Sequence, residues 1–210
     1  MLNVSTKQLI GVGVFLFAIF VGMPLIISAT GRWDFYFTLT SVALLSIASA
    51  GVWLTFYIGR INIGQGAFAL IGAYVSAILV VKSGWSFWIS LPAAGLFAAM
   101  VSIMIGIPIL RLRGVYFAMI TLVLTQVVTL TALALPITNG ARGMSSIPLP
   151  SGVSLFGIPI LPDFAGMENT KLAFYYTACI LMIVTYAALY RLVNSRLGHL
   201  CRSMQQNEEL

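Results

Sequence analysis

Long apolar stretches alternate with short polar connections along the chain. Six stretches contain no Asp, Glu, Lys or Arg: residues 8–31, 35–59, 61–81, 83–110, 114–141 and 172–190. A helix needs about 20 apolar residues to cross the roughly 30 Å hydrocarbon core of a bilayer. The pattern therefore predicts an all-α, polytopic integral membrane protein with about six transmembrane helices, near residues 9–29, 36–58, 64–81, 88–110, 114–135 and 171–191.

The first predicted span has an alternative interpretation as a cleaved signal peptide. Lys7 precedes its apolar run and small residues follow it. The run has about 20 residues, however, whereas the apolar region of a signal peptide has about 7–15. We therefore expect this span to remain as a helix.

Composition agrees with a membrane protein. The chain is 60% hydrophobic and 8% charged, whereas soluble domains carry about 25% charged residues. Its net charge of +6 comes from basic residues scattered singly between apolar runs, so we expect no nucleic-acid partner. Its two cysteines, Cys179 and Cys201, predict neither a disulfide framework nor a metal site.

The distribution of basic residues predicts the orientation, because cytoplasmic loops are enriched in Lys and Arg. With the N-terminus in the cytoplasm, the residues inside are Lys7, Arg60, Arg111, Arg113, Arg191, Arg196 and Arg202. Those outside are Arg32, Lys82, Arg142 and Lys171. The excess of basic residues on the cytoplasmic side favours a multi-pass protein of the cytoplasmic membrane whose N-terminus lies in the cytoplasm.

Several function classes lack the residues that they need. No predicted span has an ionisable residue at its centre, where proton-driven carriers usually place their coupling groups. The sequence also lacks a Gly-rich phosphate loop that ends in Gly-Lys-Ser/Thr. Its one histidine, His199, has no nucleophile or acid convincingly arranged around it. We therefore expect no enzyme and no cofactor on this chain, and uphill transport would need energy from another polypeptide.

One stretch, GRINIGQGAFALIGAY at residues 59–74, interrupts the apolar pattern with polar residues and glycines. Asn62 and Gln65 share a face if the region is helical, but the glycines disfavour a regular helix by roughly 1 kcal/mol each. Broken backbone at membrane depth is tolerated when it is buried in protein or lines a water-filled cavity, and it often forms transporter sites. The alternative is an ordinary cytoplasmic turn in which Asn62 caps the next helix.

Small residues recur every four positions in two predicted spans and so share one helix face. The sets are Ala69, Ala73 and Ala77 in the third span, and Ala94, Ala98, Ser102 and Gly106 in the fourth. Such stripes let helix backbones approach closely in lipid, so we expect both to be packing faces.

Four stretches together resemble the LivM-type inner-membrane permease subunits of branched-chain amino acid ABC importers. They are GRINIGQGAFALIGAYVSAIL (59–79), LRLRGVYFAMITL (110–122), TNGARGMSSIP (138–148) and NSRLGHLCRSMQQNEEL (194–210). The resemblance covers essentially the whole chain. Asn139, His199 and Ser203 depart from the residues that are common in the family. Family members continue for roughly another hundred residues, so the chain looks like their N-terminal two-thirds, and 194–210 like an incomplete coupling loop.

The resemblance implies a role for specific residues. Asn62, Gly64, Gln65 and Gly66 become candidates for the transport pathway or its gate, with a structural role at the break as the alternative. The ATPase-coupling candidates are Ser195, Arg196, Gly198, Arg202, Asn207 and Glu208. Arg111, Arg113 and Gly114 form a cytoplasmic turn whose arginines either anchor topology or contact an ATPase or anionic lipid headgroups.

The resemblance also implies an organisation and partners. Residues 1–193 form the transmembrane permease domain, whose external loop 136–170 faces a solute-binding protein. Residues 194–210 form the coupling segment. The partners are a second, LivH-type permease subunit and two ABC ATPase subunits, which hydrolyse the ATP. Three alternatives stay open: an ABC permease for urea or amides, a passive channel or facilitator for small polar solutes, and a purely structural membrane subunit.

Overall fold

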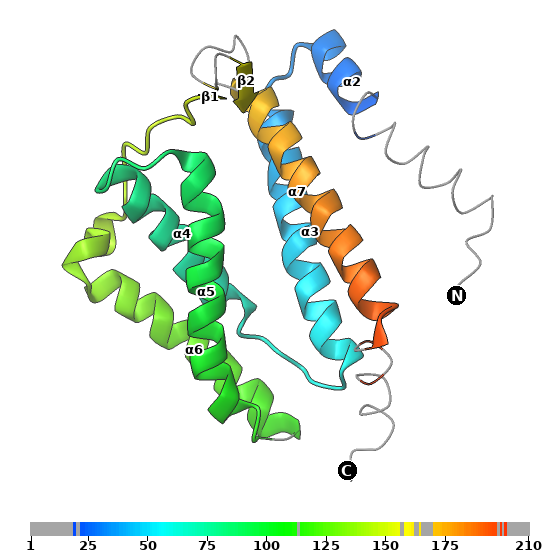
Figure 1. Ribbon diagram of the computed structural model, residues 1–210, viewed down its shortest axis with the longest axis vertical. Coiled ribbons are helices and arrows are strands. Elements are labelled where there is room, and N and C mark those ends of the chain that lie inside the picture. The colour runs from blue at the N-terminus through cyan, green and yellow to red at the C-terminus, as the bar shows by residue number, and fades with distance from the viewer. Residues whose placement is uncertain are drawn as a thin grey trace. The chain divides into compact units, whose positions relative to one another are not determined.

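Helices form almost all of the regular structure. The computed structural model describes residues 19, 22–112, 114–155, 158–161, 164, 170–196, 198 and 200. Within them lie the helices α2 (Met23–Thr30), α3 (Phe35–Tyr57), α4 (Gln65–Val81), α5 (Phe87–Ile109), α6 (Gly114–Ala134) and α7 (Thr170–Val193) (Figure 1). Among these residues, α3, α5, α6 and α7 are long and apolar enough to cross a membrane, and α4 is apolar but has 17 residues. The predicted all-α, polytopic membrane fold is confirmed.

Five of the six predicted spans begin and end within two residues of α3 to α7. The first span lies largely outside the described residues, which include Ile19 and α2 from it. The predicted external loop contains regular structure. It contains two 3-10 turns, η2 (Pro136–Thr138) and η3 (Gly140–Arg142), and an antiparallel hairpin of β1 (Val153–Leu155) and β2 (Ile158–Leu161).

The chain divides into two compact units, and residues 1–50 with 168–210 form the first. Tyr36 of α3 and Tyr175 of α7 meet in its core, with ring centroids 5.8 Å apart. The exposed pair Asp34 and Lys171 lies 3.0 Å apart just before α3 and at the start of α7. Further along, Ser46 and Tyr186 share a hydrogen bond of 2.9 Å. Since these contacts follow the same order along both helices, α3 and α7 run parallel (Figure 1).

Residues 51–167 form the second unit, in which α4 packs against α5 and α6. The predicted stripe on α5 packs in its first half, since Ala94 is buried and Ala98 lies opposite Gly72 of α4, whereas a Cβ on Gly106 would meet nothing within 4 Å. Of the predicted stripe on α4, Ala69 and Ala73 are exposed and Ala77 is half-buried, so this stripe is not the main contact of α4 with the other described helices. The face that packs carries Gly72 and Ser76 instead, and Ser76 Oγ meets Ser90 Oγ of α5 at 3.1 Å. Packing through this face gives the hydroxyl of Ser76 a polar partner.

The parallel course of α3 and α7 requires an even number of membrane crossings between their starts. An arrangement in which α3, α4, α5 and α6 each cross once meets this requirement, and it needs the 17-residue α4 to cross as well. Two contacts show which connections between the helices lie at the same end of the second unit. Lys82 Nζ donates to Ile137 O, 2.8 Å away, which joins the ends of α4 and α6. Arg60 Nη1 donates to Leu110 O at the opposite face.

Candidate functional site

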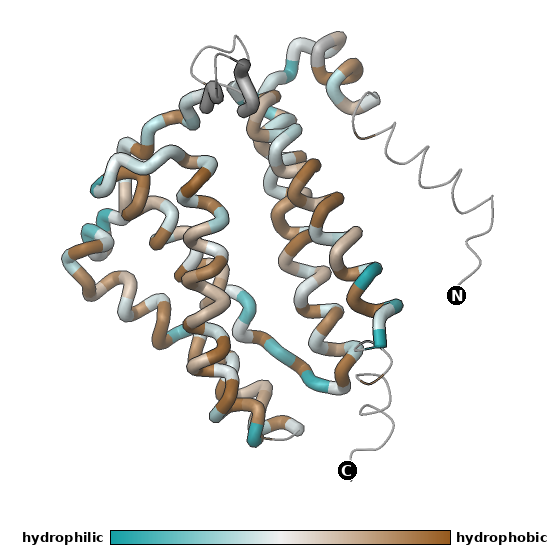
Figure 2. Tube along the Cα trace, viewed as in Figure 1, coloured by the Kyte–Doolittle hydropathy of each residue, from teal (hydrophilic) through white to brown (hydrophobic). Residues whose placement is uncertain are grey.

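The polar stretch between α3 and α4 is a true break in the helical backbone. Helix α3 ends at Tyr57, Gly59 takes a positive φ of 84°, and α4 does not begin until Gln65. Figure 2 shows this connection as the hydrophilic segment between apolar helices. We name residues 58–64 the helix break. The N–H groups of residues 58–60 still bond Thr55 O and Phe56 O in the last turn of α3. Those of residues 61–64 form no backbone hydrogen bond with a described residue, whereas a membrane-spanning helix normally satisfies such groups internally.

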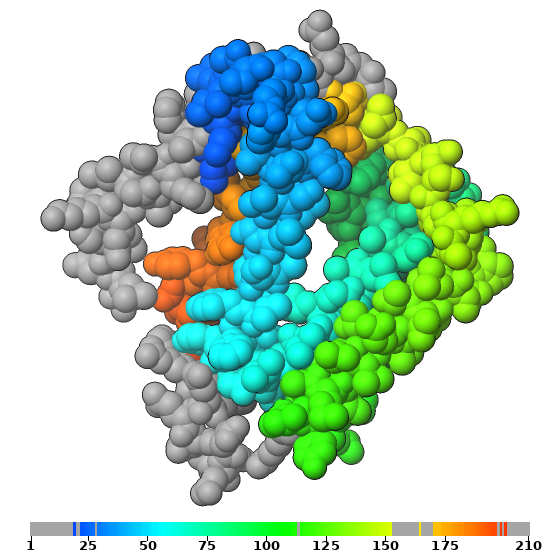
Figure 3. All heavy atoms as spheres, turned by 180° about the vertical axis from the view of Figure 1, so that it is seen from behind, coloured from blue at the N-terminus to red at the C-terminus, as the bar shows by residue number. Residues whose placement is uncertain are grey.

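Side chains replace some of the missing backbone partners. Asn62 Oδ1 accepts a hydrogen bond of 2.8 Å from Gly64 N–H. Thr121 Oγ1 of α6 accepts from Ile63 N–H at 3.2 Å. Thr125 Oγ1 shares its one proton between Thr121 O at 3.2 Å and Ile63 O at 3.5 Å. Thr121 itself is only 4% exposed. The helix break therefore lies directly against α6 (Figure 3) and is held there by hydroxyl groups.

Arg60 connects the end of the helix break that lies nearer α3 to the turn between α5 and α6. Its Nη1 donates to Leu110 O at 2.8 Å and to Leu112 O at 3.0 Å, and the guanidinium carbon lies 5.3 Å from the centre of the Phe117 ring. These carbonyls follow the last turn of α5, where the helix leaves acceptors free and favours a cation. Arg60 thus satisfies part of the α5 terminus while it fixes the helix break.

The helix break descends into the depth of the membrane-crossing helices. Arg60 meets the turn before α6, whereas Ile63 meets Thr121, seven residues after Gly114 begins the helix. At 1.5 Å per residue, that difference is about 10 Å along α6. Helix α4 then continues from this depth, which explains why 17 residues suffice for a crossing. The helix break is therefore a polar, largely non-helical segment that extends along α6 from the turn before it to Thr121.

Gln65 begins α4 at the inner end of the helix break. Its side chain is half-buried and makes no hydrogen bond with another described residue. The carboxamide lies against the backbone of α3 at Gly51. Gly51 is six residues before the end of α3, or about 9 Å along that helix. Because no described residue bonds this amide, it can form hydrogen bonds with water or a solute.

The two predicted glycines of the site differ in their surroundings. Gly64 is buried, and a Cβ there would lie 3.1 Å from Thr121 O and 3.2 Å from Asn62 Oδ1. Gly66 is exposed, and a Cβ there would meet only Thr125 Cγ2, at an ordinary 3.4 Å. The structure therefore brings Asn62, Gly64 and Gln65 together around the helix break and leaves Gly66 at its edge.

The predicted turn between α5 and α6 is present. Arg111 is exposed, Arg113 lies outside the described residues, and Gly114 begins α6 with a φ of 58° that side chains rarely adopt. Of the predicted coupling residues, Arg202, Asn207 and Glu208 also lie outside the described residues. The others follow the end of α7: Ser195 Oγ donates to Leu192 O at 2.6 Å, Arg196 is exposed and Gly198 is buried.

Four residues of the site were not predicted as such. Thr121 and Thr125 supply the hydroxyls on α6, Gly51 makes room on α3, and Arg60 was expected only to set topology. The sequence contains one signal for the hydroxyls, because Thr121, Thr125 and Thr129 recur every four residues on one face of α6. Threonines bond their own helix backbone as readily, so the spacing alone does not identify a partner.

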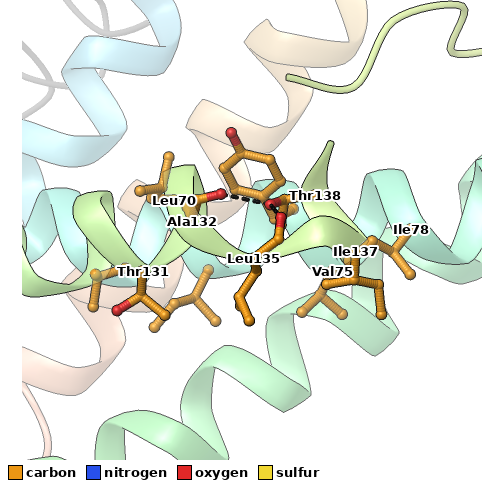
Figure 4. Close-up of a pocket in the computed structure, with 11 residues that line it drawn as sticks. Leu70, Val75, Ile78, Thr131, Ala132, Leu135, Ile137 and Thr138 are labelled. Carbon is orange, nitrogen blue, oxygen red and sulfur yellow. Dashed lines mark hydrogen bonds between the residues drawn. The ribbon is translucent and has the colours of Figure 1, made fainter. Parts of the chain in front are cut away.

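A separate apolar groove of about 260 Å³ lies between α4 and the α6–η2 segment (Figure 4). Its lining includes Leu70 and Ile78 on α4 and Leu135 beyond α6. The hydroxyls of its two threonines bond the backbone: Thr131 Oγ1 donates to Val127 O and Thr138 Oγ1 to Leu135 O, both at 2.7 Å. The groove suits a hydrocarbon group, but it does not provide the charged partners that the ends of an amino acid need.

Known proteins resemble the chain over most of its length. The model of a family described as "Branched-chain amino acid transport system / permease component" matches residues 35–210. The high-affinity branched-chain amino acid transport system permease proteins LivM of Escherichia coli (strain K12) and Salmonella typhimurium (strain LT2) are each 32% identical over 166 residues. Each alignment covers 71% of this chain and 38% of the relative, so the chain spans less than half the length of these relatives. No solved structure matches the chain significantly.

Proposed function

Because the chain belongs to the family of branched-chain amino acid transport permease components, we propose that it is a permease subunit of an ABC importer. The importer moves branched-chain, hydrophobic amino acids across the cytoplasmic membrane of a bacterium or archaeon. The observation that carries the proposal is the helix break, a polar, largely non-helical segment that extends about 10 Å along α6 among apolar helices. Such segments build solute sites in transporters.

The helix break forms the gate, and its two ends have different roles. Arg60 and the hydroxyls of Thr121 and Thr125 hold it against α5 and α6. Gln65 presents the amide that meets the solute or its water, since it has no protein partner among the described residues. Asn62 supports the bent backbone through its bond to Gly64. We therefore assign Asn62 a structural part in the gate and Gln65 the contact with the pathway.

Energy and direction come from other subunits. Two ABC ATPases hydrolyse ATP, a LivH-type permease subunit completes the pathway, and a solute-binding protein delivers the amino acid from outside. The N-terminus lies inside, so Arg60 and Arg111 face the cytoplasm and Lys82 and Arg142 face outward. The segment that follows α7, including Ser195, Arg196 and Gly198, contacts an ATPase subunit.

ATP-dependent uptake tests this function. The full-length protein is reconstituted with its partner subunits in proteoliposomes, and uptake of labelled leucine is measured with ATP or ADP on the ATPase side. We expect uptake with ATP alone, and competition by isoleucine and valine but not by urea. Equal uptake with ADP would indicate a passive channel, and ATP-dependent uptake of urea instead of leucine would indicate an amide permease.

A further inference from the structure

Gly51 of α3 lies so close to the side chain of Gln65 that a Cβ at position 51 would force the carboxamide to move. A Cβ built on Gly51 would lie 2.5 Å from Gln65 Oε1, 2.6 Å from Nε2 and 2.9 Å from Cδ. Real Cβ atoms essentially never come within 3.0 Å of a non-bonded heavy atom, so the carboxamide at the end of the flexible Gln65 side chain would have to shift. The carboxamide of Gln65 therefore rests on the backbone of α3, in the space that any other residue at position 51 would fill.

This contact separates Gly51 from the other glycines inside the described parts of α3 to α6. A Cβ on Gly95 or Gly106 of α5 would meet nothing within 4 Å, and one on Gly72 would meet Ala98 Cβ at an ordinary 3.8 Å. Glycine within a helix costs about 1 kcal/mol relative to alanine. At Gly51 the close contact explains why glycine is present despite this cost. At Gly95 and Gly106 the neighbouring atoms offer no such explanation.

From this geometry we infer that Gly51 is a positioning residue of the gate, which sets where the Gln65 carboxamide lies. The inference rests on the proposed transport function. The inner end of the gate is held differently on its two sides. On the α6 side, Thr121 and Thr125 form hydrogen bonds with Ile63. On the α3 side, among the described residues, Gln65 is placed by shape alone, so a single methyl group at position 51 displaces it.

A double-mutant cycle in the reconstituted full-length complex tests the inference. Gly51→Ala alone lowers the maximal rate of leucine uptake by about tenfold, because misplacing a site group by about 1 Å can cost up to a hundredfold in rate. Gln65→Ala removes the carboxamide and makes room for the new methyl group. Adding Gly51→Ala to Gln65→Ala therefore causes no further loss. Gly95→Ala is the matched control and leaves uptake unchanged.

Thermal unfolding of the same variants in detergent gives a second readout that needs no transport. Because alanine favours the helix, Gly51→Ala raises the melting temperature when residue 65 is Ala. With Gln65 present the rise is smaller, because the carboxamide must move away from the new methyl group. Equal effects of Gly51→Ala in both backgrounds, or none in either, would overturn the inference. If the wild-type complex showed no ATP-dependent uptake, the proposed function would fail, while the melting temperatures would still decide whether Gly51 positions Gln65.

Discussion

Thr121 accepts a hydrogen bond of 3.2 Å from the backbone N–H of Ile63, although 58 positions separate the two residues. The same hydroxyl donates to Ala118 O at 2.9 Å, so it links the helix break to the backbone of α6. A polar backbone group without a partner is costly at membrane depth. This bond explains how an apolar bundle accommodates a non-helical segment about 10 Å from its face.

Replacing Thr121 by valine should therefore destabilise the protein. Valine has nearly the same shape, but it leaves the N–H of Ile63 without its acceptor, which costs about 1–3 kcal/mol when the group is buried. We expect Thr121→Val to lower the melting temperature of the purified protein and to reduce uptake. Thr131→Val is the control, because Thr131 is exposed and its hydroxyl bonds only its own helix, at Val127 O. Equal melting temperatures for both variants would show that Ile63 finds another partner.

Arg60 should matter beyond its charge. Its two hydrogen bonds to Leu110 O and Leu112 O fix the end of the helix break that lies nearer α3, and hydrogen bonds that involve a charged group contribute roughly 1.5–3 kcal/mol. Arg60→Gln should lower both melting temperature and uptake, and Arg60→Lys should recover only part, because lysine lacks the planar fork of donors. The exposed Arg111 provides the control: Arg111→Gln removes a charge from the same turn and should leave stability unchanged. If Arg111→Gln lowered the melting temperature as much as Arg60→Gln does, the effect of Arg60→Gln would be due to charge alone.

The grouping of loops on two faces of the membrane can be measured directly. In a variant without native cysteines, we expect cysteines at Lys82 and Lys171 to react with a membrane-impermeant thiol reagent in intact cells. Cysteines at Arg111 and Arg196 should be protected until the cells are opened. The parallel course of α3 and α7 and the bond of Lys82 to Ile137 O require positions 82 and 171 to share a face. If only one of positions 82 and 171 reacted in intact cells, the result would contradict the four crossings. If position 111 reacted in intact cells, the protein would have the opposite orientation to the one predicted.

The sequence predicted the helices well because a membrane span depends on apolar length, which is a property of the chain itself. It also located the helix break, because Gly59, Gly64 and the polar pair Asn62 and Gln65 oppose a continuous apolar helix. The partners of the helix break could not be predicted in the same way. Which threonine of α6 meets Ile63 depends on how the helices pack, and Gly51 looks like any other glycine until Gln65 is placed beside it.

Two further differences have a local physical cause. Both Ala69–Ala73 and Gly72–Ser76 offer α4 a face of small residues, and the observed packing uses the one that pairs Ser76 with Ser90. The hairpin of β1 and β2 lies in a loop rich in proline, where four-residue segments are too short to show a clear period of two.

The central claim is that the helix break is the gate and that Gln65 faces the transported solute. It is tested most directly by ATP-dependent leucine uptake in the reconstituted complex that carries both Asn62→Leu and Gln65→Leu. Leucine keeps the region apolar and preserves insertion, and the loss of one buried hydrogen bond, on average about 0.6 kcal/mol in a membrane protein, does not unfold the bundle. The account predicts normal amounts of assembled complex with uptake reduced at least about tenfold, mainly through Gln65→Leu. Uptake equal to that of the wild-type complex would contradict it and leave the helix break with a structural role alone.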